Sequence, residues 1–229
     1  MGRIGFFVAL EGVDGGGKTG AVTCLAAALG EGGHDIVVTR EPGGTEEGLA
    51  LRRLLLANDA CAWEPMAELL LMNAARVQHV AKVIRPALED GKVVLCDRFV
   101  ASSIAYQGAG RGIAVADILD LHRISLGDIW PDLTVILDID PGRGIERSKS
   151  RLRTGQINEG RFEDLDLAFH HRVRRSFLDQ AAGQPDRHAV IDADRPQHLV
   201  QDDVLRTVLG AIDAKRRAGG AGMGPGMGL

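Results

Sequence analysis

Short apolar runs alternate along the chain with longer segments in which apolar positions recur at helical spacing. Most of these runs are apolar at consecutive positions, as expected for strands of a parallel sheet that helices cover on both faces. The predicted strands are Phe6–Leu10, Ile36–Thr39, Val93–Cys96, Leu133–Leu137 and His188–Ile191. The predicted helices are Lys18–Gly30, Glu46–Ala57, Pro65–Glu89, Val115–Leu126, Pro141–Ser150, Phe162–Ala181 and Gln197–Arg217.

This alternation predicts an α/β fold built on one doubly wound parallel sheet with right-handed crossovers. The chain has 229 residues, which suits a single domain with a full core, and we assign that domain to residues 1–217. Residues 218–229 are rich in Gly, and this composition predicts a disordered tail.

Charge and cysteine content narrow the class of partner. A formal net charge of −4 disfavours a general nucleic-acid or membrane-surface binder. No segment approaches the ~18 apolar residues of a membrane helix, and no signal-peptide pattern opens the chain. Cys24, Cys61 and Cys96 are isolated and lack metal-ligand spacing. We therefore expect a cytoplasmic protein with free thiols that binds neither nucleic acid nor membranes.

The first predicted strand and the first predicted helix are joined by the motif Glu11-Gly12-Val13-Asp14-Gly15-Gly16-Gly17-Lys18-Thr19. It fits the phosphate-loop pattern G-x-x-x-x-G-K-[ST], in which backbone N–H groups and the helix dipole hold a polyphosphate. Lys18 should reach the β- and γ-phosphates, and the Thr19 hydroxyl should ligate Mg²⁺. The motif predicts nucleotide binding through residues 12–19, but it does not identify the reaction.

Charged residues also follow the second and third predicted strands. Asp97 and Arg98 stand at the carboxyl edge of the sheet, where ligands bind in open α/β folds. There Asp97 is a candidate for the Mg²⁺ shell and Arg98 for a phosphate contact, although Asp97 could instead cap the next helix. Glu41 lies in a rigid turn after the second strand. Arg52 and Arg76 lie on helices, where arginines are usually solvated.

Two further segments carry candidate chemistry. The stretch Ser102-Ser103-Ile104-Ala105-Tyr106-Gln107-Gly108 is predicted to be a loop, and its hydroxyl and amide groups could contact the edge of a base. Farther along the chain, basic residues gather at Arg143, Arg147, Lys149, Arg151, Arg153 and Arg161. In a kinase such a segment would be a lid over the transferring phosphoryl group. The alternative is a solvated charge run.

Taken together, these segments resemble the thymidylate kinase family, P-loop enzymes that phosphorylate dTMP. The resemblance rests on the phosphate loop, Thr39-Arg40-Glu41-Pro42-Gly43-Gly44-Thr45, Ala74-Ala75-Arg76, Asp97-Arg98, and Ala105-Tyr106-Gln107-Gly108 with Gly110-Arg111-Gly112. It covers most of residues 4–210. It implies a five-stranded parallel sheet of the P-loop nucleoside monophosphate kinase type, a small lid at about residues 147–162, and a homodimer.

The resemblance also implies roles for single residues. It implies that ATP is bound by Gly12, Val13, Asp14, Gly15, Gly16, Gly17, Lys18 and Thr19. It also implies that Thr19 and Asp97 ligate Mg²⁺. Its acceptor-site residues are Asp14, Glu41, Arg52, Met72, Arg76, Arg98, Ser102, Tyr106 and Gln107. Among these, Arg52 and Arg98 correspond to phosphate contacts, Asp14 to a sugar contact, and Tyr106 to the residue that crowds out a ribose 2′-hydroxyl. Arg76, Ser102 and Gln107 correspond to the thymine readers.

A cation for catalysis is expected from the lid. Some members of the family carry Arg or Lys inside the phosphate loop, where this chain has Gly15 and Gly16. In the bacterial type the lid supplies that charge, which implies that Arg147, Arg151 and Arg153 join Lys18 and Arg98 as catalytic residues.

Two positions depart from the family pattern. Gly20 replaces the usual Ser or Thr after Thr19, and Met72 replaces a Phe that stacks on thymine. The expected reaction is Mg²⁺-dependent transfer from ATP to dTMP, giving dTDP. The alternatives are a kinase for another pyrimidine monophosphate such as dUMP, a non-catalytic nucleotide-binding relative, and an ATPase acting on a macromolecule.

Overall fold

The computed structural model describes residues 5–56, 63–152 and 165–221. The described strands form one parallel sheet in the order β2-β3-β1-β4-β5. They are β1 (Phe6–Glu11), β2 (Ile36–Arg40), β3 (Val93–Asp97), β4 (Leu133–Asp138) and β5 (His188–Asp192). The predicted five-stranded α/β fold is confirmed, and every strand extends one residue beyond its predicted carboxyl end.

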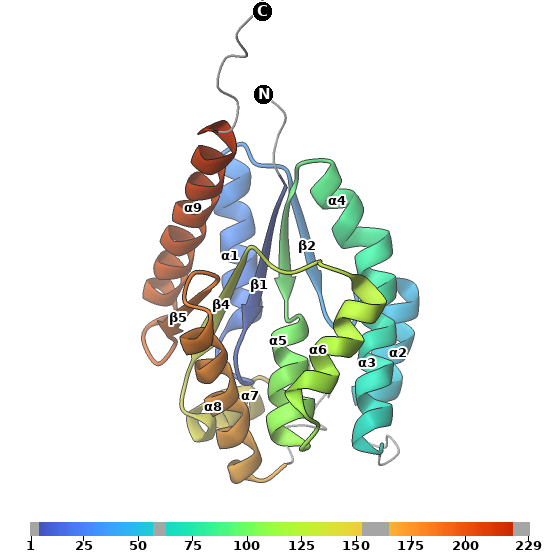
Figure 1. Cartoon of the computed structure of the whole chain (residues 1–229). Coiled ribbons are helices and arrows are strands. Elements are labelled where there is room, and N and C mark those ends of the chain that lie inside the picture. The colour runs from blue at the N-terminus through green and yellow to red at the C-terminus, as the bar shows by residue number, and fades with distance from the viewer. Residues whose placement is uncertain (1–4, 57–62, 153–164, 222–229) are drawn as a thin grey trace, which may run out of the picture.

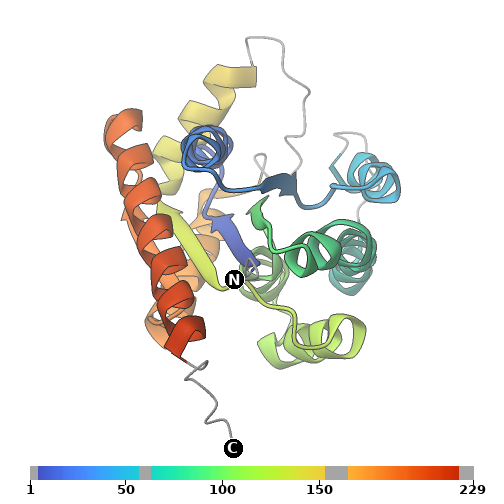
Figure 2. The same ribbon diagram turned by 90° about the horizontal axis from the view of Figure 1, so that it is seen from above.

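Helices cover both faces of this sheet (Figures 1 and 2). They are α1 (Lys18–Glu31), α2 (Glu46–Leu56), α3 (Pro65–His79), η1 (Val80–Ile84), α4 (Arg85–Glu89), α5 (Val100–Ser103), η2 (Ile104–Gly110), α6 (Val115–Leu126), α7 (Pro141–Leu152), α8 (Leu167–Gly183) and α9 (Gln197–Ala221). Among the described helices, none combines the length and apolar character that crossing a membrane requires.

The central strand β1 is buried on both sides. Phe6, Val8 and Leu10 lie in a core cluster with residues of α1, α8 and α9, whereas Phe7 and Ala9 lie in a second cluster with residues of η1 and α4. Successive side chains of a strand point to opposite faces. The continuous apolar run therefore reflects a helical layer on each face of the sheet.

The strand register brings the functional edge together. Leu10 of β1 pairs with Asp97 of β3, and Asp97 pairs with Arg40 of β2. The ends of these three strands consequently lie side by side, near α5 and α7 (Figure 1). Residues just beyond the strands can meet there even though they are far apart in sequence.

The long helix predicted between residues 65 and 89 is continuous in space but contains a wider turn. The segment η1 has π-helical bonding, and the Arg85 N–H donates to the Val80 carbonyl five residues earlier. Pro86 follows directly, and proline lacks an amide hydrogen and displaces the carbonyl four residues before it. The π turn lets the helix pass the proline without breaking.

The segment predicted as a loop after Asp97 is helical instead. Residues 100–110 form α5 and η2, although Ser and Gly give them weak helix propensity. The carboxylate of Glu11 accepts hydrogen bonds from the N–H groups of Phe99 and Ser102, at 2.7 and 3.2 Å. This capping by a residue on another strand stabilises the helix start, and no local pattern reveals it.

Helix boundaries on the carboxyl-terminal half differ modestly from the prediction. Helix α7 continues to Leu152, and α9 continues to Ala221, past the predicted end at Arg217. Helix α8 begins at Leu167 and not at Phe162, because the Asp166 side chain caps it by accepting from the Phe169 N–H at 2.6 Å. Residues 153–164, most of the predicted lid, and residues 222–229 of the predicted tail lie outside the described residues.

Candidate functional site

The phosphate loop joins β1 to the first turn of α1, as predicted. Gly17 stands before the first helical residue with φ 87°, and Gly15 has φ 80°. A Cβ on Gly15 would also clash with the carbonyl oxygen of Gly144. Only glycine combines this backbone conformation with so close an approach. The backbone path of the loop into α1 therefore depends on glycine at this position.

Lys18 lies folded against this loop. Its Nζ donates to the carbonyl oxygens of Gly12 and Val13, at 3.1 and 2.9 Å. Burial, and after it the charge of Arg98, lowers the pKa of the Lys18 ammonium to about 8, despite the carboxylates nearby. A buried cation of this kind is stabilised when an anion enters the loop.

The two predicted Mg²⁺ ligands contact each other. The Thr19 hydroxyl donates to Asp97 Oδ2 at 3.0 Å, although 78 positions separate the two residues. Both groups offer oxygen ligands, and Mg²⁺ in phosphoryl-transfer sites takes one or two protein oxygens together with phosphates and water. The residues present fit that ion.

Arg98 occupies the centre of the site and joins it to the phosphate loop. Its NH2 donates to Asp14 Oδ1 at 2.6 Å and to the Tyr106 hydroxyl at 3.3 Å, and its NH1 donates to Gly12 O and Ser102 Oγ, both at 3.0 Å. Among the described residues it is the only one besides glycine with a positive φ, at 73°. Such backbone conformations persist where surrounding contacts over-determine them, and they cluster at functional sites.

These contacts fix the charge states of the cluster. Burial alone would raise the pKa of the Asp14 carboxyl, but the charges of Arg98 and Lys18 outweigh it and lower the pKa to about 2. Burial raises the pKa of the Tyr106 phenol above its usual value, with Arg98 opposing. At neutral pH the cluster is thus a carboxylate, a guanidinium and a neutral phenol.

Glu11 contacts this cluster through Ser102, which accepts a hydrogen bond from Arg98. It is fully buried, and besides capping α5 its Oε2 accepts from the Ser102 hydroxyl at 2.6 Å. Burial raises the pKa of the Glu11 carboxyl, against the charge of Arg98. Ser102 therefore lies with Glu11 and Arg98, and its neighbour Ser103 is the serine that contacts Arg76.

A second polar cluster is buried between α3 and the turn after β2. Arg76 Nε donates to Glu41 Oε2 at 2.7 Å, while its NH2 donates to Ser103 Oγ at 2.9 Å and to Phe99 O at 3.3 Å. Arg76 and Glu41 are 3% and 5% exposed, so this is an enclosed ion pair and not the solvated helix arginine of the alternative interpretation.

His79 completes this second cluster. Its Nδ1 lies 2.9 Å from Glu41 Oε1, and its Nε2 lies 2.6 Å from Thr39 Oγ1. The ring is fully buried. It links the end of β2 to the carboxylate that holds Arg76, and so fixes the position of Glu41 from the side opposite Arg76.

Gln107 is held by a third buried residue of α3. Its Nε2 donates to Glu68 Oε1 at 2.9 Å, and Arg111 NH2 approaches Glu68 Oε2 at 3.3 Å. Met72 is half-buried. It lies on the same face of α3 as Glu68 and Arg76, because residues 68, 72 and 76 are four positions apart. Met72 thus lies between the Gln107 contact and the Arg76 contact.

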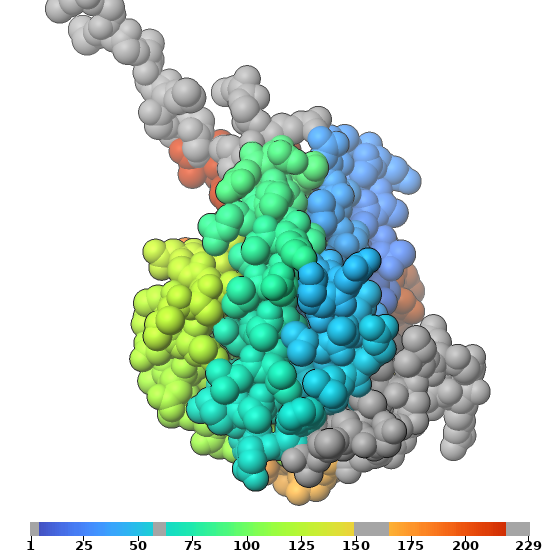
Figure 3. Space-filling view, turned by 90° about the vertical axis from the view of Figure 1, so that its right-hand side faces the viewer, coloured from blue at the N-terminus to red at the C-terminus, as the bar shows by residue number. Residues whose placement is uncertain are grey.

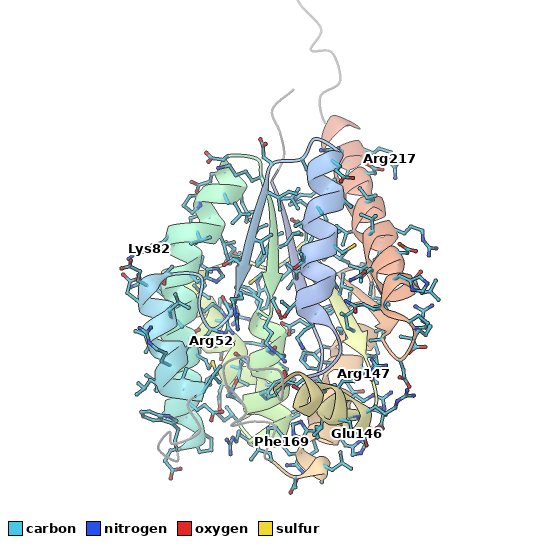
Figure 4. All side chains as sticks on the ribbon, turned by 180° about the vertical axis from the view of Figure 1, so that it is seen from behind. Arg52, Lys82, Glu146, Arg147, Phe169 and Arg217 are labelled. Atoms are coloured by element: carbon cyan, nitrogen blue, oxygen red, sulfur yellow. The ribbon has the colours of Figure 1, made fainter. Side chains whose placement is uncertain are left out.

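Arg52 and Arg147 lie on opposite sides of the site (Figure 4). Arg52 NH1 donates to Pro42 O at 2.8 Å, which places it at the turn that carries Glu41. Arg147 NH1 donates to Ala193 O at 2.9 Å, and its NH2 approaches Asp194 Oδ1 at 3.2 Å. Arg147 is therefore attached to the loop before α9. The side chain of Arg151 and all of Arg153 lie outside the described part of the chain.

The amide side chains of Gln197 and Gln201 lie next to Gly20. A Cβ there would lie 2.6 Å from Gln197 Nε2, and Gln201 Nε2 donates to the Gly20 carbonyl at 3.3 Å. Helix α9 thus packs its amide side chains directly on the first turn of α1, and a side chain at position 20 would require the flexible end of Gln197 to move.

Sequence reasoning did not single out Glu11, Glu68 or His79 as site residues. All three are buried polar side chains that hold a candidate contact residue in place. The spacing of Glu68 four residues before Met72 and eight before Arg76 was the available signal, since it puts the three on one helix face.

Comparisons with known proteins show which family the chain is similar to. The family model described as thymidylate kinase matches residues 10–204. A thymidylate kinase of Cereibacter sphaeroides is 59% identical over 88% of this chain and 93% of its own length, and one of Thermomicrobium roseum is 45% identical over 93% and 99%. The crystal structure of thymidylate kinase from Ehrlichia chaffeensis superposes with a TM-score of 0.73 at 34% identity, covering 90% of this chain and 99% of that one.

Proposed function

The chain belongs to the thymidylate kinase family, and we propose that it transfers the γ-phosphoryl group of ATP to the 5′-phosphate of dTMP, giving ADP and dTDP. One observation carries the proposal: Asp97 contacts Thr19 of the phosphate loop, and the next residue, Arg98, contacts Asp14. Two neighbouring residues at the end of β3 therefore serve the donor side and the acceptor side of a single transfer.

On the donor side, the N–H groups of residues 12–19 bind the ATP phosphates, and Lys18 leaves its carbonyl partners to contact the β- and γ-phosphates. Thr19 and Asp97 would hold Mg²⁺. When bound, the ion neutralises charge on the donor phosphates.

On the acceptor side, Arg98 and Arg52 bind the phosphate of dTMP. The Arg98 guanidinium is already paired with Asp14, so the carboxylate both orients it and reaches the sugar. Tyr106 lies against the same guanidinium, with the Arg98 carbon 5.1 Å from the ring centre. We assign to this ring the exclusion of a ribose 2′-hydroxyl that the family resemblance implies, which favours a deoxynucleotide.

The base lies between α3 and η2 in this proposal. Arg76 and Gln107 contact its polar edge, and Met72 covers its face with a polarizable thioether. Glu41 holds Arg76. Ser102 contributes through its hydrogen bond with Arg98, and Ser103 through Arg76.

The transfer needs no general base, because an ionised phosphate oxygen is the nucleophile. Catalysis then depends on positioning the two phosphates and on neutralising their charge. The phosphate loop carries Gly15 and Gly16 where a cation could stand, so we assign the additional charge to the lid, through Arg147, Arg151 and Arg153.

We also propose a homodimer that forms through α2, α3 and α6, which lie side by side on one face of the molecule (Figure 3). Each of these helices carries an exposed large apolar side chain, with Leu54 48%, Leu70 50% and Ile124 85% exposed. In a homodimer these side chains would be buried against the partner, which is the role we assign to them. Sedimentation of the wild type and of Leu70→Glu tests it, and a monomeric wild type would contradict it.

We also propose a cytoplasmic location, which agrees with the unpaired state of two cysteines. Cys24 and Cys96 are free, and unpaired cysteines are typical of reducing compartments.

An ADP-release assay against dTMP, dUMP, dCMP and other nucleoside monophosphates tests the function. We expect turnover that requires both Mg²⁺ and a monophosphate, with dTMP the preferred acceptor. ADP release independent of any monophosphate would contradict a kinase and indicate an ATPase.

A further inference from the structure

The contacts of α3 with the 100–110 segment form a seam with a polar pair at each end. At one end Gln107 Nε2 donates to Glu68, and at the other Arg76 NH2 donates to Ser103, both at 2.9 Å. Eight residues separate Glu68 from Arg76, which is about 12 Å along a helix. Met72 lies midway on that face and is half-buried.

The partner of Gln107 determines how its amide is oriented. A carboxylate only accepts hydrogen bonds, so the group facing Glu68 must be the NH₂ of the Gln107 amide and not its oxygen. Glu68 itself is fully buried and forms an ion pair with Arg111. Glu68 therefore holds Gln107 in one of its two possible orientations.

Two groups of these residues remain available to a ligand. Neither the Gln107 carbonyl oxygen nor Arg76 NH1 has a hydrogen-bond partner among the described residues, since the contacts of the two side chains use other atoms. Some side-chain atoms of the described residues are both fully enclosed and without a hydrogen-bond partner, but these two atoms do not belong to that group. Because they have no partner and are not fully enclosed, both face accessible space. The seam consequently presents one acceptor, from Gln107, and one donor, from Arg76.

We propose that Glu68 is a positioning residue that sets the base selectivity of the acceptor site. By fixing the Gln107 amide with its oxygen outward, it selects a pyrimidine with an N–H donor at ring position 3 beside a carbonyl, as in thymine and uracil. Cytosine places an acceptor and an amine at those two positions and meets Gln107 and Arg76 with the wrong polarity. This inference rests on the proposed function, since it deepens the description of the same site.

The test is Glu68→Gln, which keeps the size of the side chain but can also donate. Gln107 is then free to present either end of its amide. We expect dTMP and dUMP to bind about tenfold more weakly, by the same factor, because both lose the same hydrogen bond. Binding of dCMP should not weaken, so the preference for dTMP over dCMP falls about tenfold while kcat for dTMP stays within about threefold.

Arg111→Gln is the matched control, because it removes the Arg111 ion pair but leaves Glu68 to hold Gln107. It should lower thermal stability and retain the preference for dTMP over dCMP. An unchanged preference in Glu68→Gln, or a loss of dTMP binding without an equal loss for dUMP, would overturn the proposal.

Calorimetric binding of the three monophosphates separates this inference from the proposed function. If the wild type binds dTMP but does not turn it over with ATP, the kinase proposal fails while the binding ratios still test Glu68. If the wild type binds none of the three, or binds dCMP as tightly as dTMP, the role of Glu68 in base selection is wrong.

Discussion

The phosphate-loop region and the seam between α3 and the 100–110 segment, where we propose that the base binds, are built in different ways. The loop is one contiguous segment that runs directly into Lys18 and Thr19, and the Lys18 side chain donates to two carbonyls of that same segment. The seam is made of buried side chains from two elements, α3 and η2, and each contact residue is held by another, as Glu68 holds Gln107 and Glu41 holds Arg76.

This difference has a functional meaning. Phosphates look alike in all nucleotides, so a backbone cradle that ignores side-chain identity is sufficient for the donor. A base is distinguished by the order of its donors and acceptors, and only oriented side chains can match that order. Substitutions in the loop should therefore affect catalysis, whereas substitutions in the seam should affect the choice of acceptor.

The largest effect is expected from Lys18→Ala. Removing this cation should lower kcat by about 10³-fold or more, since charge neutralisation carries the transfer. Circular dichroism should show a folded protein, and calorimetry should show dTMP binding within about threefold of the wild type. Loss of dTMP binding together with turnover would show that the two regions are not separable.

The next effect concerns the lid. Arg151→Ala should lower kcat by about 10²-fold or more and change the KM for dTMP little, because the charge acts in the transition state. Steady-state kinetics of Arg147→Ala and Arg153→Ala provide the comparison, and Arg147 should matter less because Ala193 and Asp194 hold it. Changes below about threefold in all three variants would mean that the basic run is a solvated face.

The pH dependence distinguishes the two regions without a mutation. Because the pKa of Lys18 in the free protein is lowered to about 8, raising the pH above that value removes its charge. The kcat/KM for ATP should then fall about tenfold per pH unit, since this parameter follows the free enzyme. The kcat should stay flat to higher pH, because bound phosphates favour the protonated amine. An ATP profile that is level to pH 10 would contradict this assignment.

The smallest effect is expected in the seam, from Met72→Phe. An aromatic platform under a base is worth ~1–3 kcal/mol, of which methionine already provides part. We expect dTMP to bind about threefold to tenfold more tightly, or ~1 kcal/mol, with the KM for ATP unchanged. The KM values for dTMP and dUMP, measured in the wild type and in Met72→Phe, test this prediction. If every acceptor is unaffected, Met72 does not lie under the base.

Local patterns were sufficient to predict the sheet and the phosphate loop. Each strand could be located to within one residue at its carboxyl end, because continuous apolar runs are characteristic of a sheet covered on both faces. The contact of Thr19 with Asp97 was also foreseeable, since Asp97 ends β3 and Thr19 follows β1, and the two strands end at one edge. These features depend on short segments and on general rules for parallel sheets.

The supporting residues were not predictable in the same way. Glu68 and His79 lie in an ordinary-looking helix, and only the fold shows that both are buried against partners at least 38 positions away. The helix at 100–110 was missed for a related reason, since its cap comes from β1. Ser102 and Ser103 are adjacent and chemically identical, and their division between two clusters depends on the phase of that helix.

The capping of α5 by Glu11 also has a consequence for the order of folding. Its hydrogen bonds join residues 88 and 91 positions apart, so the cap can form only after β1 and β3 have paired. Until then nothing stabilises a helix in the 100–110 segment. The relative positions of its four site residues, Ser102, Ser103, Tyr106 and Gln107, are therefore not fixed. These four residues should therefore become ordered on folding, and disordered on unfolding, as one cooperative unit. In amide hydrogen exchange this would appear as a block of residues that exchange together and that dTMP protects together.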